Sequence, residues 1–538
     1  MTQTSEAPPA KKKEKPIVQQ LVELAEKEFD LFMDERGVAY ASYSNGNGTD
    51  TMPVRSEEMD VIWRDLFRKK KGVFVNNEQM TNAKAYVTAT ARADKKQLKT
   101  RFNYVHRGRQ ADIISVHLSD PGHFVEIKPR TIRQVRNGPI LFRSFKHQKA
   151  LDFSSNFMSV QQTLKWINVK SPSDQLLLLV WLVLAPFECI PRPLLVLTGP
   201  QGAAKTTTAK VLRSLLDPSN VPVLTPKENQ VEWALALFQH AVPIFDNLGK
   251  LQPWQADMLC KAVTGDGISK RTLYTNEDTT ILSYQRAIIM SGINLPSVQP
   301  DLLDRSLLIE LERIPPEERK AEAKLWEDFN AVKPRIVGGL FKTISRTLRM
   351  FNPNKKLPLT RMADFAALGC AAARAMGYTE KQFLAALQLN LERQNQQVLE
   401  SEPLARAIIR LVKSCGGFWE GTAGQLSSDL KDIVGKRAED GDEDFAPNIW
   451  QPRSLGRHLR ELQATFIDYG IHLSFIRQGK AGVRLIRLDG RGNLKDSGFD
   501  VSLSAGRRKA KTKKKTADKR LTSTPKKAQK GRRDRKKK

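Results

Sequence analysis

One short segment limits the fold more than any other part of the chain. The apolar run LLVLT precedes the turn GPQGAAKTTTAK, which contains the Lys-Thr pair Lys205 and Thr206. A buried strand, a glycine-rich turn and a helix in this order are typical of the phosphate-binding loop of nucleotide hydrolases, whose pattern is G-x-x-x-x-G-K-[ST]. Ala204 replaces the last glycine of that pattern. The segment therefore predicts an α/β fold and leaves one backbone position in question.

The chemistry of the loop tolerates alanine, because the phosphate is held by backbone N–H groups and by the start of a helix. Alanine costs on the order of 1 kcal/mol if the position needs a positive φ, and almost nothing if it already opens the helix. AAKTTTAKVLRSLL favours a helix from Ala203 onward, so we expect the second case. A glycine turn with a purely structural role is the alternative. The expected nucleotide contacts are Gly199, Pro200, Gln201, Gly202, Ala203, Ala204, Lys205, Thr206 and Thr207.

Polar residues follow the apolar strands downstream of the loop. AVPIF ends in Asp246, which is placed to bind the same Mg²⁺ as Thr206, and RAIIMSGIN ends in Asn294, a residue suited to hold water or sense the γ phosphate. PDLLDRSLLIEL places Arg305 at a helix end, from which it can reach a neighbouring subunit's nucleotide. A turn residue, a strand cap and half of a surface ion pair are the structural alternatives. Their order after one phosphate loop favours a nucleotide site.

Together with AVTGDGISKRTLYT, these segments resemble the ATPase of replication proteins from phages and mobile elements. Those proteins are the primase-associated helicases, which are related to superfamily 3 and to the AAA+ class. The resemblance covers about residues 160–390. It implies a P-loop ATPase that forms a ring, usually a hexamer, around DNA and hydrolyses ATP with Mg²⁺ between subunits. The catalytic roles it implies are Walker A for Lys205 and Thr206, Walker B for Asp246, sensor for Asn294 and arginine finger for Arg305.

The sequence pattern predicts a hairpin between Gly265 and Tyr284, and the resemblance implies that this hairpin grips DNA, with Lys270 and Arg271 in the pore. Two solvated charges on a loop are the alternative. One departure concerns the catalytic base: Asn247 stands where many AAA+ enzymes carry a glutamate. An amide can orient a water but takes no proton usefully, so hydrolysis is slow or another carboxylate acts as base. Glu228 and Glu232 are the candidates.

Changes in pattern divide the chain into an α/β core and smaller units. Residues 17–135 are expected to form a small α+β domain that includes two strands around an Asn-Gly turn, and helices of a lid are expected after the core. The expected boundaries are 1–16 for a charged leader, 17–135 for the N-terminal domain, 136–160 for a linker, 161–315 for an AAA+-like core with a parallel sheet, 316–400 for a helical lid, 401–490 for a winged helix and 491–538 for a disordered basic tail.

The winged helix is expected from three amphipathic segments followed by the alternating pair IHLSFIRQGKAGVRLIRL. In this unit we expect the third helix to enter the major groove of DNA and the hairpin to contact the DNA phosphates. Protein docking is the alternative use of such a unit. The expected DNA contacts outside the pore are Arg457, Arg460, Arg477, Lys480 and Arg484.

The net charge of +30 points to polyanionic partners, and residues 506–538 alone carry 18 Lys or Arg against two Asp. This polycation binds nucleic acid or serves as a solubility or address tail. Four cysteines without C-x-x-C spacing predict a reducing compartment and no structural zinc. The apolar stretch from Leu176 is interrupted by Glu188 and Arg192, so we expect a buried helix and strand and no membrane partner.

Two functions remain open at this point. The first is an ATP-driven helicase or translocase that acts on single-stranded or forked DNA in the replication of a phage or mobile element. The second is a nucleotide-gated initiator or loader scaffold with little turnover. The expected compartment is the cytoplasm of a bacterium or an infected cell, and a separate primase or polymerase is a possible partner. No pair of strand-borne aspartates predicts nucleotide polymerisation within this chain.

Overall fold

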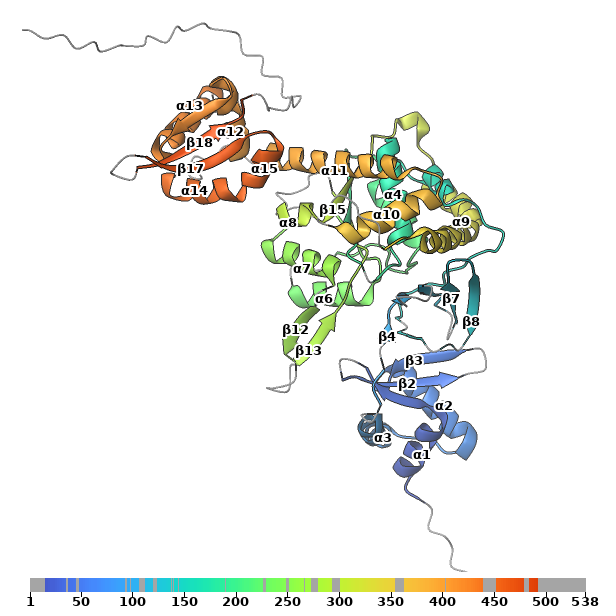
Figure 1. The fold of residues 1–538 in the computed structure, drawn as a ribbon. Coiled ribbons are helices and arrows are strands. Elements are labelled where there is room, and N and C mark those ends of the chain that lie inside the picture. The colour runs from blue at the N-terminus through green and yellow to red at the C-terminus, as the bar shows by residue number, and fades with distance from the viewer. Residues whose placement is uncertain are drawn as a thin grey trace, which may run out of the picture.

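The computed structural model describes residues 15–491 with short gaps, and Figure 1 shows an N-terminal, a central and a C-terminal part. The gaps in the description are residues 35–36, 45–47, 92–93, 97, 106–111, 120–122, 137, 139, 144, 189, 226–228, 248–250, 266, 272–278, 293–299, 354–361, 402, 439–450 and 479–482. The expected charged leader and most of the basic tail therefore lie outside the described residues.

The N-terminal part combines three helices with a three-stranded antiparallel sheet. Its elements are α1 (Ile17–Glu28), β1 (Asp30–Met33), β2 (Ala39–Ser44), β3 (Thr49–Pro53), α2 (Glu57–Lys71) and α3 (Asn77–Thr90). The Ser56 hydroxyl accepts a hydrogen bond from the Met59 N–H at the start of α2, as expected of an N-cap. Strands β2 and β3 confirm the predicted strand pair. The core of this part contains Leu21, Trp63, Phe67 and Met80.

A four-stranded parallel sheet in the order β11-β14-β10-β15 forms the centre of the molecule. Its strands are β10 (Leu194–Thr198), β11 (Ile244–Asp246), β14 (Ile289–Ser291) and β15 (Ser306–Glu310). The accompanying helices are α4 (Pro172–Leu184), α5 (Lys205–Ser214), α6 (Gln230–Gln239), α7 (Pro253–Thr264) and α8 (Pro300–Leu303), and an antiparallel hairpin consists of β12 (Gly267–Arg271) and β13 (Thr279–Ser283). The prediction of an α/β fold with a parallel sheet is confirmed.

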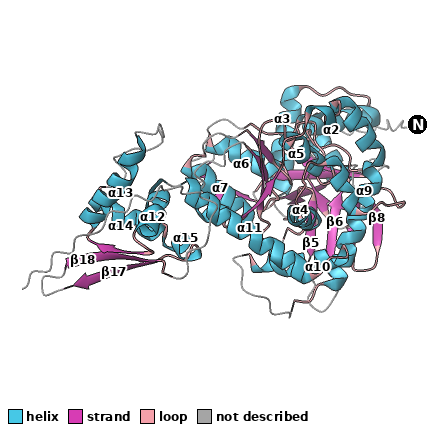
Figure 2. Ribbon diagram, turned by 90° about the horizontal axis from the view of Figure 1, so that it is seen from above, coloured by secondary structure: helices cyan, strands magenta, loops and turns pink. Residues whose placement is uncertain are grey.

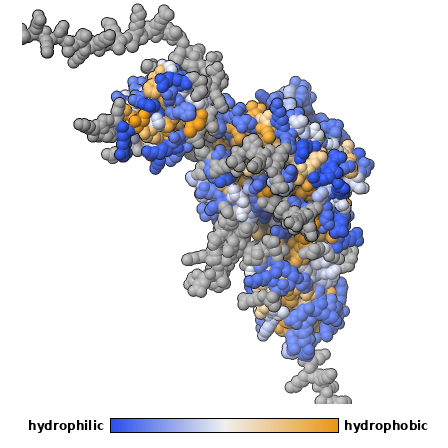
Figure 3. All heavy atoms as spheres, viewed as in Figure 1, coloured by the Kyte–Doolittle hydropathy of each residue, from blue (hydrophilic) through white to orange (hydrophobic). Residues whose placement is uncertain are grey.

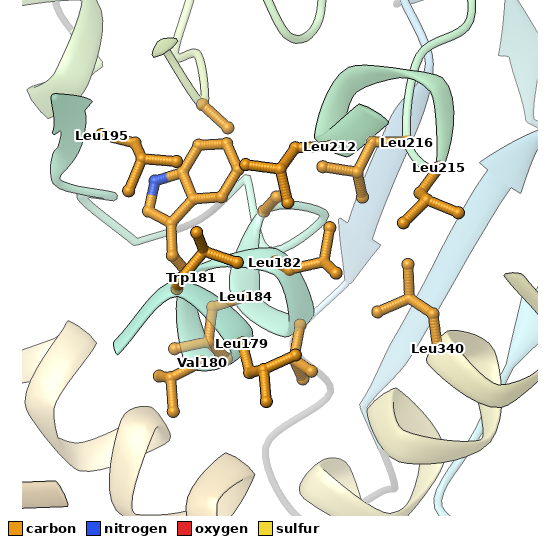
Figure 4. Packing of buried hydrophobic residues seen from close by; sticks show 14 of the residues in the cluster. Leu179, Val180, Trp181, Leu182, Leu184, Leu195, Leu212, Leu215, Leu216 and Leu340 are labelled. Carbon is orange, nitrogen blue, oxygen red and sulfur yellow. The ribbon is translucent and has the colours of Figure 1, made fainter. Parts of the chain in front are cut away.

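Beyond its polar first turn, helix α4 is apolar on all sides and lies inside the central core. Ser171 caps its first turn, and every residue from Leu176 to Leu184 is buried. The Trp181 indole N–H donates to the Pro193 carbonyl oxygen at 2.8 Å, which satisfies the one polar atom of that side chain. Figure 4 shows Trp181 packed between Leu195 of β10 and Leu212 of α5. The apolar stretch is thus a buried helix followed by a buried strand, as predicted.

Three long helices follow the sheet and cover α4. They are α9 (Glu322–Met350), α10 (Ala363–Ala375) and α11 (Glu380–Ser401), and short 3-10 helices lie at Val160–Trp166 and Pro316–Glu318. Helices α9, α10 and α11 all contact α4, and their buried residues belong to the same core. The helical stretch predicted after residue 316 is therefore present and packs on the central body.

A second antiparallel sheet, in the order β5-β6-β7-β8, also packs on the central body. Its strands are β5 (Phe102–Val105), β6 (Ile113–His117), β7 (His123–Ile127) and β8 (Ile132–Arg136), and the short parallel pair β4 (Leu98–Lys99) and β9 (Leu141–Phe142) lies beside it. Figure 2 shows β8 next to α9, which contacts both β7 and β8. Phe102, Ile114 and Val125 share the core of α4 and α9. The expected domain 17–135 therefore does not have a single core, because its second half buries its apolar face against the central helices.

The C-terminal part has a separate core and follows α11, as Figure 1 shows. Its elements are α12 (Pro403–Ser414), β16 (Phe418–Gly421), α13 (Ala423–Ala438), α14 (Pro452–Glu461), α15 (Gln463–Asp468), β17 (His472–Gln478) and β18 (Val483–Asp489), with the sheet order β16-β18-β17. The helices and the strand pair expected from the sequence are present. The extra strand β16 pairs with β18.

The surface of the molecule differs from these cores. Hydrophilic residues cover most of the visible described surface, and apolar residues form smaller patches (Figure 3). Across the described ranges, none of the helices has the length and apolar character that a membrane crossing requires.

Candidate functional site

The turn between β10 and α5 depends on two glycines. Gly199 has a φ of +136°, and a Cβ at this position would lie 2.2 Å from the Leu311 carbonyl oxygen. Gly202 has a φ of +77°, and a Cβ there would lie 3.3 Å from a guanidinium nitrogen of Arg319. Both positions combine a left-handed backbone with a close neighbour, so side chains are disfavoured there. The glycines of the predicted phosphate loop are therefore required by its shape.

Ala204 adopts the conformation that the sequence argument did not favour. It is the N-cap of α5, with φ +61° and ψ +34°, and the helix begins at Lys205. The expectation that the helix opens at Ala203 and leaves Ala204 unstrained is wrong. A left-handed alanine costs on the order of 1 kcal/mol, so the surrounding contacts must hold this conformation. Helix propensity could not reveal this, because the backbone angle is set by the turn and not by the residues that follow.

Neighbouring segments hold the turn in place. The Asn168 amide donates to the carbonyl oxygens of Ala203 at 3.2 Å and Glu312 at 2.6 Å. The Ile314 N–H donates to the Gly202 carbonyl oxygen at 3.2 Å. The segment after β15 and the segment before α4 therefore brace the same turn from two sides. No local sequence pattern connects Asn168 or Arg319 to the loop.

Lys205 folds back over the turn that precedes it. Its ammonium donates to the carbonyl oxygens of Gly199 at 2.6 Å and Pro200 at 2.9 Å. Partial burial lowers the pKa of Lys205, and the Asp246 carboxylate opposes this effect. The side chain is thus a cation held against the glycine turn, where a phosphate group would be a suitable partner.

Three side chains meet where the carboxyl ends of neighbouring strands lie together. The Thr206 hydroxyl donates to Asp246 Oδ2 at 2.6 Å, and the Ser291 hydroxyl donates to Asp246 Oδ1. Asp246 ends β11 and Ser291 ends the adjacent β14. The structure therefore brings together Lys205, Thr206 and Asp246 as predicted, and adds Ser291. The signal for Ser291 is its place in RAIIMSGIN, the segment predicted to end as a strand at Asn294; the strand β14 ends at Ser291, and Asn294 lies outside the described residues.

The cluster of Thr206 and Asp246 offers the kind of oxygen ligands that Mg²⁺ prefers. A hydroxyl and a carboxylate are hard oxygen ligands, and Mg²⁺ usually keeps one or two such protein ligands together with water and substrate phosphates. Within the described ranges, no group of three or more His, Cys, Asp or Glu is arranged to hold a metal. Thr206 and Asp246 therefore fit a cation that also binds phosphate oxygens, and do not form an all-protein cage.

Asn247 has a structural reason to be asparagine. Its φ is +52°, its side chain is exposed, and its N–H donates to the Ser291 carbonyl oxygen at 3.0 Å. Asparagine is enriched several-fold at such left-handed positions, whereas glutamate is not. The turn geometry thus accounts for the amide in this place. Of the two other base candidates, Glu228 lies outside the described residues and Glu232 lies in the first turn of α6.

Arg305 lies at the opposite end of the sheet from the loop. Its carbonyl oxygen accepts a hydrogen bond from the Leu194 N–H at the first residue of β10, whereas the loop follows the last. A strand of this length separates them by about 16 Å. The guanidinium pairs with the Asp301 carboxylate and donates to the Asp301 carbonyl oxygen at 2.9 Å, and the carboxylate hydrogen bond raises its pKa. Arg305 is therefore too far away to act on a phosphate in the loop of its own chain.

The predicted hairpin is present as β12 and β13. Lys270 pairs with Thr280 and Arg271 pairs with Thr279 in its antiparallel register. The hairpin extends away from the central sheet beside α6 and α7 (Figure 1). Only the backbone is described here, so Lys270 and Arg271 are located on β12 without an account of their side chains.

The predicted DNA contacts of the C-terminal part gather in one cleft of about 580 Å³. It is lined by Arg457 and Arg460 from α14 and by Arg477 and Arg484 from the strand pair, all of them exposed. The Arg460 guanidinium lies 4.8 Å from the centre of the Phe475 ring. Lys480 lies outside the described residues. The four arginines form a concave basic surface with an aromatic ring in its wall.

Comparisons with known proteins concern the central and C-terminal parts. Residues 160–395 match the family model "Actinomycete integrative conjugative element replication protein", and residues 404–516 match the model "AICE RepA C-terminal domain". These matches support a replication-related function for a mobile element. A search of curated proteins found no match.

Solved structures with detectable similarity include three apo structures of the NrS-1 C-terminal region. The first is 10% identical, with a TM-score of 0.38, and the alignment covers 88% of this chain and 99% of that one. The second is 12% identical, with a TM-score of 0.37, and covers 89% and 100%. The third is 11% identical, with a TM-score of 0.37, and covers 88% and 99%. TM-scores below 0.5 do not establish a common fold.

Proposed function

We propose that this protein is an ATP-dependent DNA helicase or translocase that acts in the replication of a mobile element. The observation that carries the proposal is the convergence of Lys205, Thr206 and Asp246 beside a braced glycine turn. On this interpretation the central part is a P-loop ATPase of the AAA+ and superfamily 3 type, α9 to α11 are its lid, and the C-terminal part is a winged helix.

The turn would bind the triphosphate with its backbone N–H groups and with Lys205. The ammonium would exchange its contacts with the Gly199 and Pro200 carbonyl oxygens for contacts with the β and γ phosphates. Because Asn168 and Ile314 already hold the turn, little ordering is left for the ligand to impose. A preformed turn favours binding by reducing that cost.

Thr206 and Asp246 would hold Mg²⁺ when nucleotide is bound, and the ion would neutralise negative charge on the phosphates. Ser291 keeps Asp246 oriented through its hydrogen bond to Oδ1. Asn247 and Asn294 would orient the attacking water but would not accept its proton, which leaves Glu228 or Glu232 as base candidates. Hydrolysis on this scheme is expected to be slow without DNA.

Arg305 would complete the site of the next subunit in a ring, for which we propose a hexamer. Its distance from the loop of its own chain supports a role in trans, and Asp301 would have to share or release the guanidinium. Arginines supplied in trans stabilise the charge of the transferring phosphate. This arrangement would couple hydrolysis to contact between subunits.

Single-stranded or forked DNA is the proposed substrate. Lys270 and Arg271 of the hairpin would contact it in the pore, and the arginine cleft of the C-terminal part, with Lys480, would contact duplex or forked regions. We further propose action in the cytoplasm, with a separate primase or polymerase as a possible partner. The basic tail would add salt-dependent affinity.

A nucleotide-gated initiator or loader scaffold is a second candidate, and Asn247 favours it because no carboxylate directly follows Asp246. ATPase assays with and without forked DNA separate the two functions. A translocase is expected to show DNA-stimulated turnover that Lys205→Ala and Arg305→Ala each reduce by about 10³-fold. Mixing the two variants should restore part of the activity, since shared sites then pair an intact loop with an intact arginine.

The outcomes of this experiment are distinct. Binding of ATP and DNA with little stimulated turnover supports the scaffold. Stimulated turnover without rescue on mixing removes the shared site. No uptake of nucleotide by the folded protein overturns both functions.

A further inference from the structure

A second basic cleft lies on the helices that follow the central sheet, away from the sites described above. It has a volume of about 530 Å³ and is formed by residues 157–161, the second half of α9 and the end of α10. Backbone hydrogen bonds hold its wall on α9, since the Met158 N–H donates to the Arg335 carbonyl oxygen at 2.9 Å. The cations that line it are Lys342, Arg346, Arg349 and Arg374.

Three of these cations form a row along α9. Positions 342, 346 and 349 are separated by four and three residues, which places them on one face of a helix. At 1.5 Å per residue the row spans about 10 Å. That length is greater than one phosphate group needs, and it suits successive phosphates of a polymer.

Among the described residues, none neutralises the charges of this row through an ion pair. None of the described residues that line the cleft is acidic. In the described part of the chain, Lys342, Arg346 and Arg349 make no ion pair. Arg374 is different, because it pairs with Glu380 at 3.3 Å and donates to the Met350 carbonyl oxygen at 2.6 Å. Its role at the end of α9 is structural.

A structural role does not explain why the row on α9 carries three cations. Arg349 lies in the last turn of α9, where a cation stabilises the helix dipole. That effect is confined to the last turn, so it does not account for Lys342 and Arg346. The Lys342 ammonium lies 3.7 Å from the centre of the Phe157 ring, and Phe157 is 43% exposed. Cations beside an exposed aromatic ring are the combination that binds single-stranded nucleic acid.

We propose that this α9 cleft binds the sugar–phosphate backbone of a nucleic acid strand. Figure 1 shows α9 and the β12–β13 hairpin on opposite sides of the central part, so the cleft would be a separate contact from the pore hairpin. The inference rests on the DNA-binding half of the proposed function and is independent of ATP hydrolysis.

The test uses the full chain and a fluorescent single-stranded oligonucleotide in anisotropy titrations at several salt concentrations. The triple variant Lys342→Gln, Arg346→Gln, Arg349→Gln is expected to bind more weakly and to reduce the slope of log K against log salt by about 2, at roughly 0.7 per lost phosphate contact. The matched control is Lys69→Gln, Lys70→Gln, Lys71→Gln on α2, which removes the same charge. The basic tail is common to all three proteins, so it cancels in the comparison.

Two further measurements locate the contact and identify the ligand. Photo-crosslinking of the wild-type protein to bromouracil-substituted DNA should label peptides that contain Phe157 or residues 342–350. Inorganic phosphate at millimolar concentration should not displace the oligonucleotide from the cleft. Displacement with a slope change below one in the triple variant indicates a single-anion site and overturns the proposal.

The remaining outcomes separate this inference from the proposed function. If the wild-type protein binds DNA and the triple variant has the slope of the control, the cleft is not a nucleic acid site although the proposed function stands. If no variant, wild type included, binds DNA, the DNA-binding half of the proposed function fails and this inference fails with it.

Discussion

The two ends of helix α5 are built in different ways. At its start, Lys205 and Thr206 are partly exposed and contact the Gly199 carbonyl oxygen and the Asp246 carboxylate, respectively. Just beyond its end, Asp217 is completely buried, and its Oδ1 accepts a hydrogen bond from Arg101 Nε at 2.9 Å. One end is open to solvent, and the other is closed by the protein itself.

The closed end joins parts that are distant in sequence. Arg101 stands just before β5, and its guanidinium also donates to the His117 carbonyl oxygen at 2.9 Å. Asp217 Oδ2 accepts from the Ala241 N–H at 3.1 Å, close to β11. Burial opposes ionisation of Asp217, but Arg101 and Arg213 lower its pKa in spite of that. The contrast teaches that α5 is anchored at one end so that its other end can present the loop in a defined position.

The largest expected effect comes from breaking the closed end. Asp217→Ala should lower the free energy of unfolding of the central part by about 3–5 kcal/mol, because it leaves the buried charges of Arg101 and Arg213 without their carboxylate partner. Urea unfolding followed by tryptophan fluorescence measures the loss. Asp257→Ala, an exposed carboxylate on α7, is the control and should change stability by no more than about 0.5 kcal/mol. Equal effects of the two substitutions would contradict the anchoring role.

A smaller effect is expected from acid at the same end. His240 Nδ1 lies 2.7 Å from Arg213 Nη2, and burial together with Arg213 lowers the pKa of His240 to about 3. The other groups that face it are His147, Asp217 and Arg286. Below pH 6.5, His240 is protonated in the unfolded chain but stays neutral in the folded protein. The free energy of unfolding therefore falls as the pH drops towards 3. The loss at pH 5 is about 2 kcal/mol.

His240→Gln tests this contribution, because glutamine keeps a hydrogen-bond acceptor but does not titrate. The difference in unfolding free energy between pH 7 and pH 5 should be smaller in the variant than in the wild type. Part of the acid sensitivity should remain, since burial also lowers the pKa of His117 to about 3. An identical pH dependence in both proteins would mean that His240 is not kept neutral by the fold.

The smallest expected effect lies at the open end. Ala204→Gly should stabilise the protein by about 1 kcal/mol, because glycine adopts the left-handed conformation without a Cβ penalty. Ala209→Gly, in the interior of α5, is the control and should destabilise by about 1 kcal/mol or more. Thermal unfolding of the three proteins gives the order. A destabilising Ala204→Gly would show that the strain assigned to this position is absent.

Local pattern predicted much of the candidate site and the elements that carry it. The strand, turn and helix around Lys205, the buried helix from Leu176 and the hairpin at Lys270 follow from residues that are neighbours in sequence. Asp246 was found because it ends an apolar strand, and parallel strands bring such ends together. No local pattern reveals the roles of Ser291 and Asn168, because these depend on partners more than 30 residues away in the chain.

By itself, the sequence determined most of the helices and strands, which of their faces are apolar, and that a glycine turn precedes α5. The spacing of apolar residues and the preferences of turn residues depend on residues that are close in the sequence. These features can therefore be predicted without knowledge of the tertiary structure. Only the tertiary structure decided that β5 to β8 pack with α4 and α9, that Ala204 is left-handed, and that Arg101 closes the far end of α5. Each of these features depends on which segments, far apart in the sequence, pack against one another, and that packing is determined by the chain as a whole.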